Sequence, residues 1–170
     1  NNIDCQQNNL TALPALPNSL RQLYCPQNNL ISLPALPDSL QLLSVDNNSL
    51  TNLPPLPSQL LVLSCANNSI SSLPSLPDSL GTLFCWNNNL SSLPELPPGI
   101  MQMDVRNNFI SCLPYLPSGL PQLAASGNGI SCLPNLPAYP NFNCDIGYMI
   151  CPVHYSACDT FPVIKGKVFY

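Results

Sequence analysis

Apolar and polar positions follow one another along this chain in a block of twenty residues that repeats seven times. One apolar column contains Ile3, Leu23, Leu43, Leu63, Leu83, Met103 and Leu123, and another contains Leu10, Leu30, Leu50, Ile70, Leu90, Ile110 and Ile130. Each block also carries the segment Leu-Pro-x-Leu-Pro. A fixed period of this length is typical of a solenoid, in which each repeat forms one coil that buries its apolar side chains against its neighbours.

Each block predicts one short strand followed by an extended return segment. In the segment 20–25, Leu23 and Cys25 are two positions apart, so both side chains point inward from a β-strand. Because the blocks are in register, successive strands lie side by side and parallel. The two prolines of each return segment lack an N–H and fix φ, so they exclude a helix there. We therefore expect a β-rich solenoid with little helix.

One polar column is as regular as the apolar ones, because every block has an asparagine between its strand and its return segment. The column contains Asn8, Asn28, Asn48, Asn68, Asn88, Asn108 and Asn128. These amides could form a row of polar ligands, or they could bond to backbone groups that the tight turn leaves inside the coil. An amide carries both a donor and an acceptor, so we favour the backbone role.

The consensus LxxLxCxxNxLxxLPxLPxx resembles the leucine-rich-repeat family, and its twenty-residue length with the LPxLP return is similar to the short bacterial class. The resemblance covers residues 1–140. It implies a right-handed superhelix with a parallel sheet on the concave side and extended, polyproline-like returns on the convex side. It also implies that the concave face binds another macromolecule.

The periodic pattern ends near residue 140. Phe142 and Cys144 fit the two inward positions of an eighth strand if the preceding return loop is one residue short. We assign residues 141–162 to this terminal strand and an irregular C-terminal cap. Residues 163–170 alternate again and are expected to begin a following β module or a linker. Both ends of the chain are expected to continue in a longer protein.

Composition narrows the classes of partner. Only 7% of the residues are charged, the formal net charge is −4, and the basic residues number four. So few cations cannot neutralise a nucleic-acid backbone or an anionic membrane surface. No apolar run reaches the roughly 18 residues that a membrane helix needs. We expect no nucleic-acid partner, no membrane insertion and a monomer.

Candidate catalytic and metal-binding groups are sparse. The single histidine, His154, lies near Cys144, Cys151 and Cys158, which could form a Cys–His catalytic pair or a metal site. Their spacing fits no common zinc module closely. A packing or surface role for His154 is the better interpretation. We expect no enzymatic activity, metal or cofactor.

The outward positions of the strands vary from repeat to repeat, so recognition residues can be placed there without cost to the core. Phe84 and Trp86 share one strand, and Asp104 and Arg106 share the next, about 5 Å away. An exposed tryptophan beside an arginine is typical of an interface hot spot. Aromatic shielding of the strand backbone is the alternative, and it remains open. The other candidates on this face are Gln102, Tyr24 and Asp46.

Three functional hypotheses follow. The first is a secreted or cell-surface recognition or adhesion module that binds a protein or glycan through the concave face, and the cysteine content favours this extracellular setting. The second is a structural spacer or stalk. The third is binding of ice or a crystalline polysaccharide through a row of hydroxyls, which Ile31 interrupts. That row contains Thr11, Thr51, Ser71, Ser91, Ser111 and Ser131.

The nine cysteines divide by position. Cys5, Cys25, Cys65, Cys85 and Cys144 are assigned to the inward column that elsewhere holds small apolar residues, so we expect buried free thiols. Cys112 and Cys132 occupy one column on adjacent coils, about 5 Å apart, which is within bonding range. We expect disulfides Cys112–Cys132 and Cys151–Cys158, with pairing of Cys144 to Cys151 or Cys158 as the competing arrangement.

Overall fold

The computed structural model describes residues 1–138, 140–146 and 150 of the 170-residue chain. This part contains eight short strands and no helix. The strands are β1 (Asn2–Asp4), β2 (Gln22–Tyr24), β3 (Leu42–Ser44), β4 (Val62–Ser64), β5 (Thr82–Phe84), β6 (Gln102–Asp104), β7 (Gln122–Ala124) and β8 (Asn143–Cys144). The predicted exclusion of helix from the proline-rich returns is confirmed for these residues.

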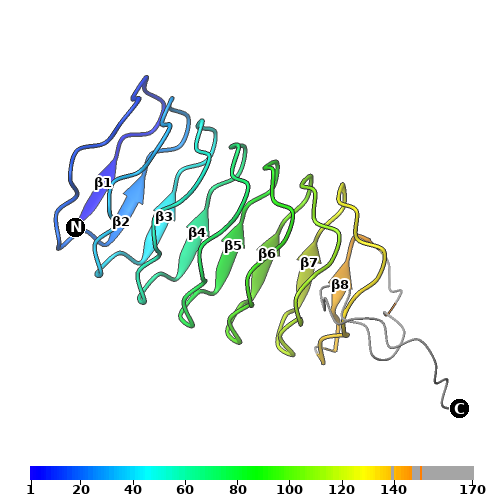
Figure 1. Cartoon of the computed structure of the whole chain (residues 1–170). Coiled ribbons are helices and arrows are strands. Elements are labelled where there is room, and N and C mark those ends of the chain that lie inside the picture. Colours follow the sequence, from blue (N-terminus) through cyan, green and yellow to red (C-terminus); the bar gives the residue numbers. More distant parts are fainter. Residues whose placement is uncertain (139, 147–149, 151–170) are drawn as a thin grey trace, which may run out of the picture.

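The strands form one parallel sheet in sequence order, β1 to β8. From β1 to β7 each residue pairs with the residue twenty positions later, as Ile3 does with Leu23. Figure 1 shows the coils side by side in a row, with the strands lined up along one side of the solenoid and the returns looping away from them. The predicted β-rich solenoid is confirmed.

The inward side chains of the strands form one continuous core. Leu23, Leu43, Leu63 and Leu83 are fully buried, and so are Cys25, Val45, Cys65, Cys85 and Val105 in the second inward column. Each return ends in a tight turn, in which the Leu20 N–H donates to the Pro17 carbonyl at 3.0 Å. This turn directs Leu20 and its equivalents into the core, where they are also buried.

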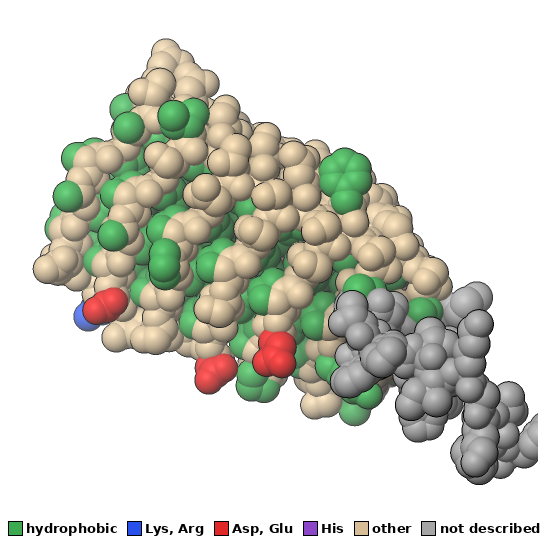
Figure 2. All heavy atoms as spheres, in the orientation of Figure 1, with side chains coloured by type: hydrophobic (Ala, Val, Ile, Leu, Met, Phe, Trp, Pro, Cys, Tyr) green, Lys and Arg blue, Asp and Glu red, His purple; other side chains and the backbone are tan. Residues whose placement is uncertain are grey.

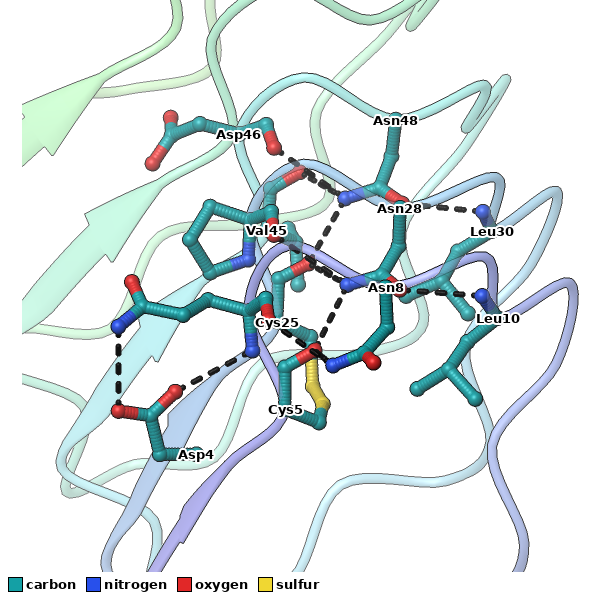
Figure 3. The surroundings of a disulfide bond; sticks show 12 residues. Asp4, Cys5, Asn8, Leu10, Cys25, Asn28, Leu30, Val45, Asp46 and Asn48 are labelled. Atoms are coloured by element: carbon teal, nitrogen blue, oxygen red, sulfur yellow. Dashed lines mark hydrogen bonds between the residues drawn. A yellow bond between two sulfur atoms is a disulfide. The ribbon is translucent and has the colours of Figure 1, made fainter.

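The asparagine column bonds to the backbone, as the sequence favoured. Asn28 Nδ2 donates to the carbonyl of Cys5 on the preceding coil at 2.9 Å, and its Oδ1 accepts from the Leu10 N–H at 3.0 Å. Asn48 repeats both bonds one coil later, with Cys25 and Leu30. Figure 3 shows the asparagines stacked above one another. No buried side-chain polar atom among the described residues is without a partner.

The residue before each of these asparagines has a left-handed backbone. Gln7, Gln27 and four asparagines have φ between 52° and 57°, and Gly127 has φ 73°. Asparagine and glycine adopt this region more readily than other residues do. The turn that follows every strand therefore restricts this column as well as the buried asparagine column.

The register of the last strand differs from the prediction. Cys144 pairs with Leu123 and Asn143 pairs with Gln122, so the last return is one residue longer than the others, not one residue shorter. The expected placement of Phe142 and Cys144 at the two inward positions was wrong. The longer return brings Cys144 into the leucine column and lets both Phe142 and Ile146 pack against the core as half-buried residues.

The cysteine assignment also needs correction. Cys5 and Cys25 form a disulfide, with their Cα atoms 4.9 Å apart, and are not free thiols. The same register that makes them equivalent to small apolar residues places them within the bonding range of about 4.4–6.8 Å. Cys65, Cys85 and Cys144 are buried free thiols, as predicted. Cys112 and Cys132 are each disulfide-bonded, and their pairing with each other stays a prediction.

Several expectations fall outside the described residues. The Cys151–Cys158 disulfide, the role of His154, the cap from residue 151 to 162 and the β module expected at 163–170 belong to this group. Ahead of them, Ile150 forms a parallel bridge to Leu133.

Candidate functional site

The described surface has an open hollow on the outward sheet face, by which we mean the strand side chains that point away from the core together with the residues directly after them. The hollow lies over β5 to β8 and has a volume of about 320 Å³. It is lined by Phe84, Gln102, Met103, Asp104, Arg106, Gln122, Leu123, Ala124, Asn143 and Asp145. Four of the seven residues predicted for partner binding are therefore brought together here.

The parallel register positions these four residues. Phe84 on β5 pairs directly with Asp104 on β6, and Gln102 is two positions before Asp104 on the same strand. Phe84 is half-buried and Gln102 is exposed, so the hollow has an apolar wall and a polar rim. Because the outward column varies between repeats, no other coil offers this combination.

Asp104 and Arg106 form a close ion pair within the hollow. Arg106 Nε donates to both carboxylate oxygens of Asp104, at 2.9 Å and 3.1 Å, and Nη2 donates to Oδ2 at 2.6 Å. The side chain of Arg106 is 48% exposed and that of Asp104 is 14% exposed. The hydrogen bonds and charge of Asp104 raise the pKa of the Arg106 guanidinium. Surface ion pairs add little stability, so the main effect of this pair is to fix the guanidinium in place.

A second carboxylate, that of Asp145, lies at the C-terminal side of the hollow. It follows Cys144 of β8, and its Oδ1 accepts from the Ala125 N–H at 2.7 Å and from the Ser126 N–H at 3.1 Å. Burial acts to raise the pKa of Asp145, but these backbone bonds outweigh it and hold the pKa below its ordinary value. With Asp104, Asp145 and Arg106, the hollow contains two carboxylates and one guanidinium.

Three predicted residues lie elsewhere on the same face. Trp86 follows β5 and is half-buried, but it does not line the hollow. Tyr24 is half-buried on β2, between Asp4 and Ser44 of the neighbouring strands. Neither aromatic side chain is buried in the core, and no further structural observation assigns them a partner.

Asp46 has a structural role that the sequence analysis missed. Its Oδ1 accepts from the Ser64 hydroxyl and from the Ala66 N–H, both at 2.7 Å, and its Oδ2 accepts from the Ser44 hydroxyl at 3.0 Å. The carboxylate therefore ties β3 to β4. Asp145 accepts from the two residues directly after β7, so a second carboxylate on the outward face also joins neighbouring coils.

The sequence analysis also missed Gln122, Asn143 and Asp145 as members of the site. Gln122 is the outward residue of β7 opposite Asn143 of β8. The signal for Asn143 and Asp145 was present in the chain, because an eighth strand must carry outward residues like the others. The irregular spacing after residue 140 obscured which of its residues those are.

The hydroxyl row of the third hypothesis is exposed, but Ile31 stands within it with 65% of its surface exposed. The regular array of hydroxyls is therefore interrupted at the second coil. Figure 2 shows one face of the molecule, on which hydrophobic and neutral side chains lie side by side and charged side chains are few.

The described residues show no group that could hold a metal ion. Within the same part of the chain, no helix is long and apolar enough to span a bilayer. The candidate metal residues Cys151, His154 and Cys158 lie outside the described residues, so the metal site that they could form stays a hypothesis from the sequence.

No protein-family model matches this chain, and a comparison with curated protein sequences finds no similar one. Solved structures do match. The chain is 40% identical to YopM, a leucine-rich effector protein from Yersinia pestis, with a TM-score of 0.78 over 82% of this chain and 40% of that one. It is 38% identical to YopM from Yersinia enterocolitica, with a TM-score of 0.64 over 79% of this chain and 34% of that one.

The leucine-rich-repeat domain of a Shigella effector is also similar, with 32% identity and a TM-score of 0.72 over 81% of this chain and 61% of that one. The chain thus spans less than two thirds of each of these three structures. Its structural neighbours are bacterial leucine-rich-repeat effectors, and its fold is a leucine-rich-repeat solenoid.

Proposed function

We propose that this chain is a non-enzymatic recognition module of the short LPxLP class of bacterial leucine-rich-repeat proteins, and that it binds a protein partner through the outward sheet face. The observation that carries the proposal is the hollow over β5 to β8, where Phe84, Gln102, Asp104 and Arg106 meet. These residues occupy columns that vary between repeats, whereas the core and the asparagine column are nearly constant. The similarity to bacterial effectors supports the choice of a macromolecular partner.

The residues that line the hollow favour a protein as the binding partner. The aromatic wall provides apolar contact, and the arginine beside it provides planar hydrogen bonding. Aromatic residues and arginine are both enriched in protein interfaces. Because Asp104 already holds the Arg106 guanidinium, less side-chain entropy is lost when a partner binds. The unbalanced carboxylate is complementary to a single lysine or arginine of the partner.

The proposed setting is outside the cell. The Cys5–Cys25 disulfide is of the kind that persists in oxidising compartments. A secreted or surface-displayed adhesion module, monomeric and exposing this face, is consistent with that bond and with the low content of charged residues.

The experiment is an affinity comparison. Secreted and surface proteins, together with a glycan array, are screened against the wild-type chain, and each binder is then measured against two variants. One is Phe84→Ala with Arg106→Ala in the hollow. The other is Tyr115→Ala, which removes a ring that is 71% exposed on a return segment away from the hollow. We expect the double variant to lose about 2 kcal/mol or more of binding free energy, and the Tyr115 variant to bind like the wild type.

The other hypotheses give different outcomes. If a glycan binds and the double variant loses that binding, the hollow is the binding site but the partner is a glycan and not a protein. Binding that is unaffected by the double variant would overturn the site, and the absence of any binder would favour a spacer.

A further inference from the structure

We infer that Cys65 and Cys85 are a further disulfide site, which closes by reaction with a small-molecule disulfide such as oxidised glutathione when coils four and five open transiently. Both cysteines are free thiols and fully buried in the core. The inference is independent of the proposed function, and it rests on the repetition of one backbone frame at two places in the solenoid.

The first place is the Cys5–Cys25 pair, where the bond exists. The Cys5 N–H donates to the Tyr24 carbonyl at 2.8 Å, and the next bond along, from the Gln7 N–H to the Pro26 carbonyl, is 3.0 Å. Figure 3 shows the bonded sulfurs between the two stacked coils. The Cα atoms are 4.9 Å apart.

The second place, at Cys65 and Cys85, has the same frame. The Cys65 N–H donates to the Phe84 carbonyl at 2.8 Å, and the Asn67 N–H donates to the Trp86 carbonyl at 3.0 Å. The strand residues just before the two cysteines pair with each other, Ser64 with Phe84. Two cysteines held in this register lie one coil apart, within bonding range.

The asparagine column completes the equivalence. Asn28 Nδ2 donates to the carbonyls of Cys5 and Cys25, at 2.9 Å and 3.3 Å. Asn88 Nδ2 donates in the same way to Cys65 and Cys85, at 3.0 Å and 3.1 Å. The carbonyl groups of each cysteine pair are therefore joined by one amide, which fixes the spacing of the two coils at that point.

What differs between the two places is access. Cys5 belongs to the first described coil and is partly exposed, whereas Cys65 and Cys85 lie in the middle of the solenoid. Burial raises the pKa of both inner thiols, and a thiol reacts with a disulfide only as the thiolate. The inner pair therefore stays reduced until its coils separate enough to admit the oxidant.

The reaction balances in two exchanges. The thiolate of one cysteine attacks glutathione disulfide, so a mixed disulfide forms and one glutathione thiolate leaves. The thiolate of the other cysteine then attacks the protein sulfur of that mixed disulfide, and the second glutathione thiolate leaves. Two protein thiols lose two protons and two electrons, and the two glutathione thiolates that leave hold the electrons and take up the protons as two glutathione thiols.

The Cys65–Cys85 disulfide can be detected as a linked pair of peptides after cleavage before aspartate residues. Protease that cuts before aspartate releases 46–77, which contains Cys65, and 78–103, which contains Cys85, whereas Cys5 and Cys25 stay together in 4–37. The protein is incubated with oxidised glutathione in denaturant below its unfolding midpoint, its remaining thiols are alkylated, and the digest is analysed by mass spectrometry. We expect a disulfide-linked peptide 46–77 with 78–103.

The matched control is the double substitution Cys85→Val with Val105→Cys, which keeps the number of cysteines and the core column but separates the pair by two coils. Linkage of Cys65 should be lost in this variant, and amide exchange confirms that it is folded. Wild-type protein in which both cysteines remain alkylatable, although exchange shows that coils four and five open, would overturn the inference. Equal linkage in the control would do so too, because it would show random pairing of unfolded chains.

Discussion

Asn88 Nδ2 donates a hydrogen bond to the carbonyl of Cys65, twenty-three positions earlier and one coil away, at 3.0 Å. Its Oδ1 accepts from the Ile70 N–H at 2.9 Å. One buried amide thus satisfies a carbonyl and an N–H that the turns of the solenoid leave inside, where an unpaired backbone group is costly. This relationship recurs down the column, and it is what allows a chain of turns and prolines to form a close-packed stack.

Replacing Asn88 by alanine is expected to destabilise the protein by about 3 kcal/mol, because several buried backbone groups lose their partner at once. The control is Asn8→Ala in the first described coil. Asn8 is exposed, and its amide donates to the carbonyls of Cys5 and Gln6 within its own coil, so its loss should cost less than about 1 kcal/mol. Chemical denaturation of both variants measures the difference, and equal effects would contradict the structural role of the buried column.

The Cys5–Cys25 disulfide closes a loop of twenty residues in the first two coils. Substituting both cysteines by alanine should lower the free energy of unfolding by roughly 2–4 kcal/mol, through the larger entropy of the unfolded chain. Protection of the amides in β1 and β2 should fall more than that in β5 and β6, because coils contact mainly their neighbours. Uniform loss of protection across the sheet would show that the coils unfold as a single unit.

Gly127 is the one described glycine in the left-handed region, with φ 73°, and a Cβ there would meet the Asn107 side chain. Gly127→Ala is therefore expected to destabilise the protein by about 1–3 kcal/mol. Gly119→Ala has open space around it and no left-handed backbone, so it should be stabilising by less than about 1 kcal/mol. Thermal unfolding distinguishes them, and a neutral Gly127 variant would mean that Asn107 moves aside freely.

Asp145, directly after β8, accepts hydrogen bonds from the backbone directly after β7, and its folded-state pKa is below the ordinary value of an aspartate. Its contribution to stability is therefore fully present above about pH 4, the unfolded-state pKa, and is lost as the pH falls through the lower folded pKa. Asp145→Asn should remove this part of the acid dependence. Denaturation curves between pH 2 and pH 6, about the range that brackets both values, test it, and identical slopes for the two proteins would contradict it.

The repeat pattern predicted most of the fold because each column has one dominant physical role. Leucines at positions such as Leu23 and Leu43 must be buried, prolines exclude helix, and the asparagine amides have only backbone groups to bond. The last strand was misplaced because one inserted residue in the final return changes the register. Phe142, Cys144 and Ile146 alternate with polar residues, so either Phe142 with Cys144 or Cys144 with Ile146 fits the two inward positions.

The disulfide was missed for a different reason. Cys5 and Cys25 share a column with Val45, which indicates a small apolar role. They also lie on adjacent coils, and that spacing places them within bonding range. The hollow could be predicted only in part, since Phe84, Asp104 and Arg106 follow from the strand register. The ion pair between Asp104 and Arg106 and the backbone bonds of Asp145 depend on side-chain conformations that a repeat pattern does not encode.

The claim that the outward sheet face binds a protein is tested most directly by hydroxyl-radical footprinting of the chain with and without its partner. Phe84 and Trp86 lie on that face, and Met103 lines the hollow from beneath. Phe109 and Tyr115, which are 70% and 71% exposed on the turn after β6 and on the return that follows it, serve as internal references. Reduced oxidation of Phe84 and Trp86 in the complex, with Phe109 and Tyr115 unchanged, is the predicted result. Protection of Phe109 or Tyr115 with Phe84 unaffected would contradict the account.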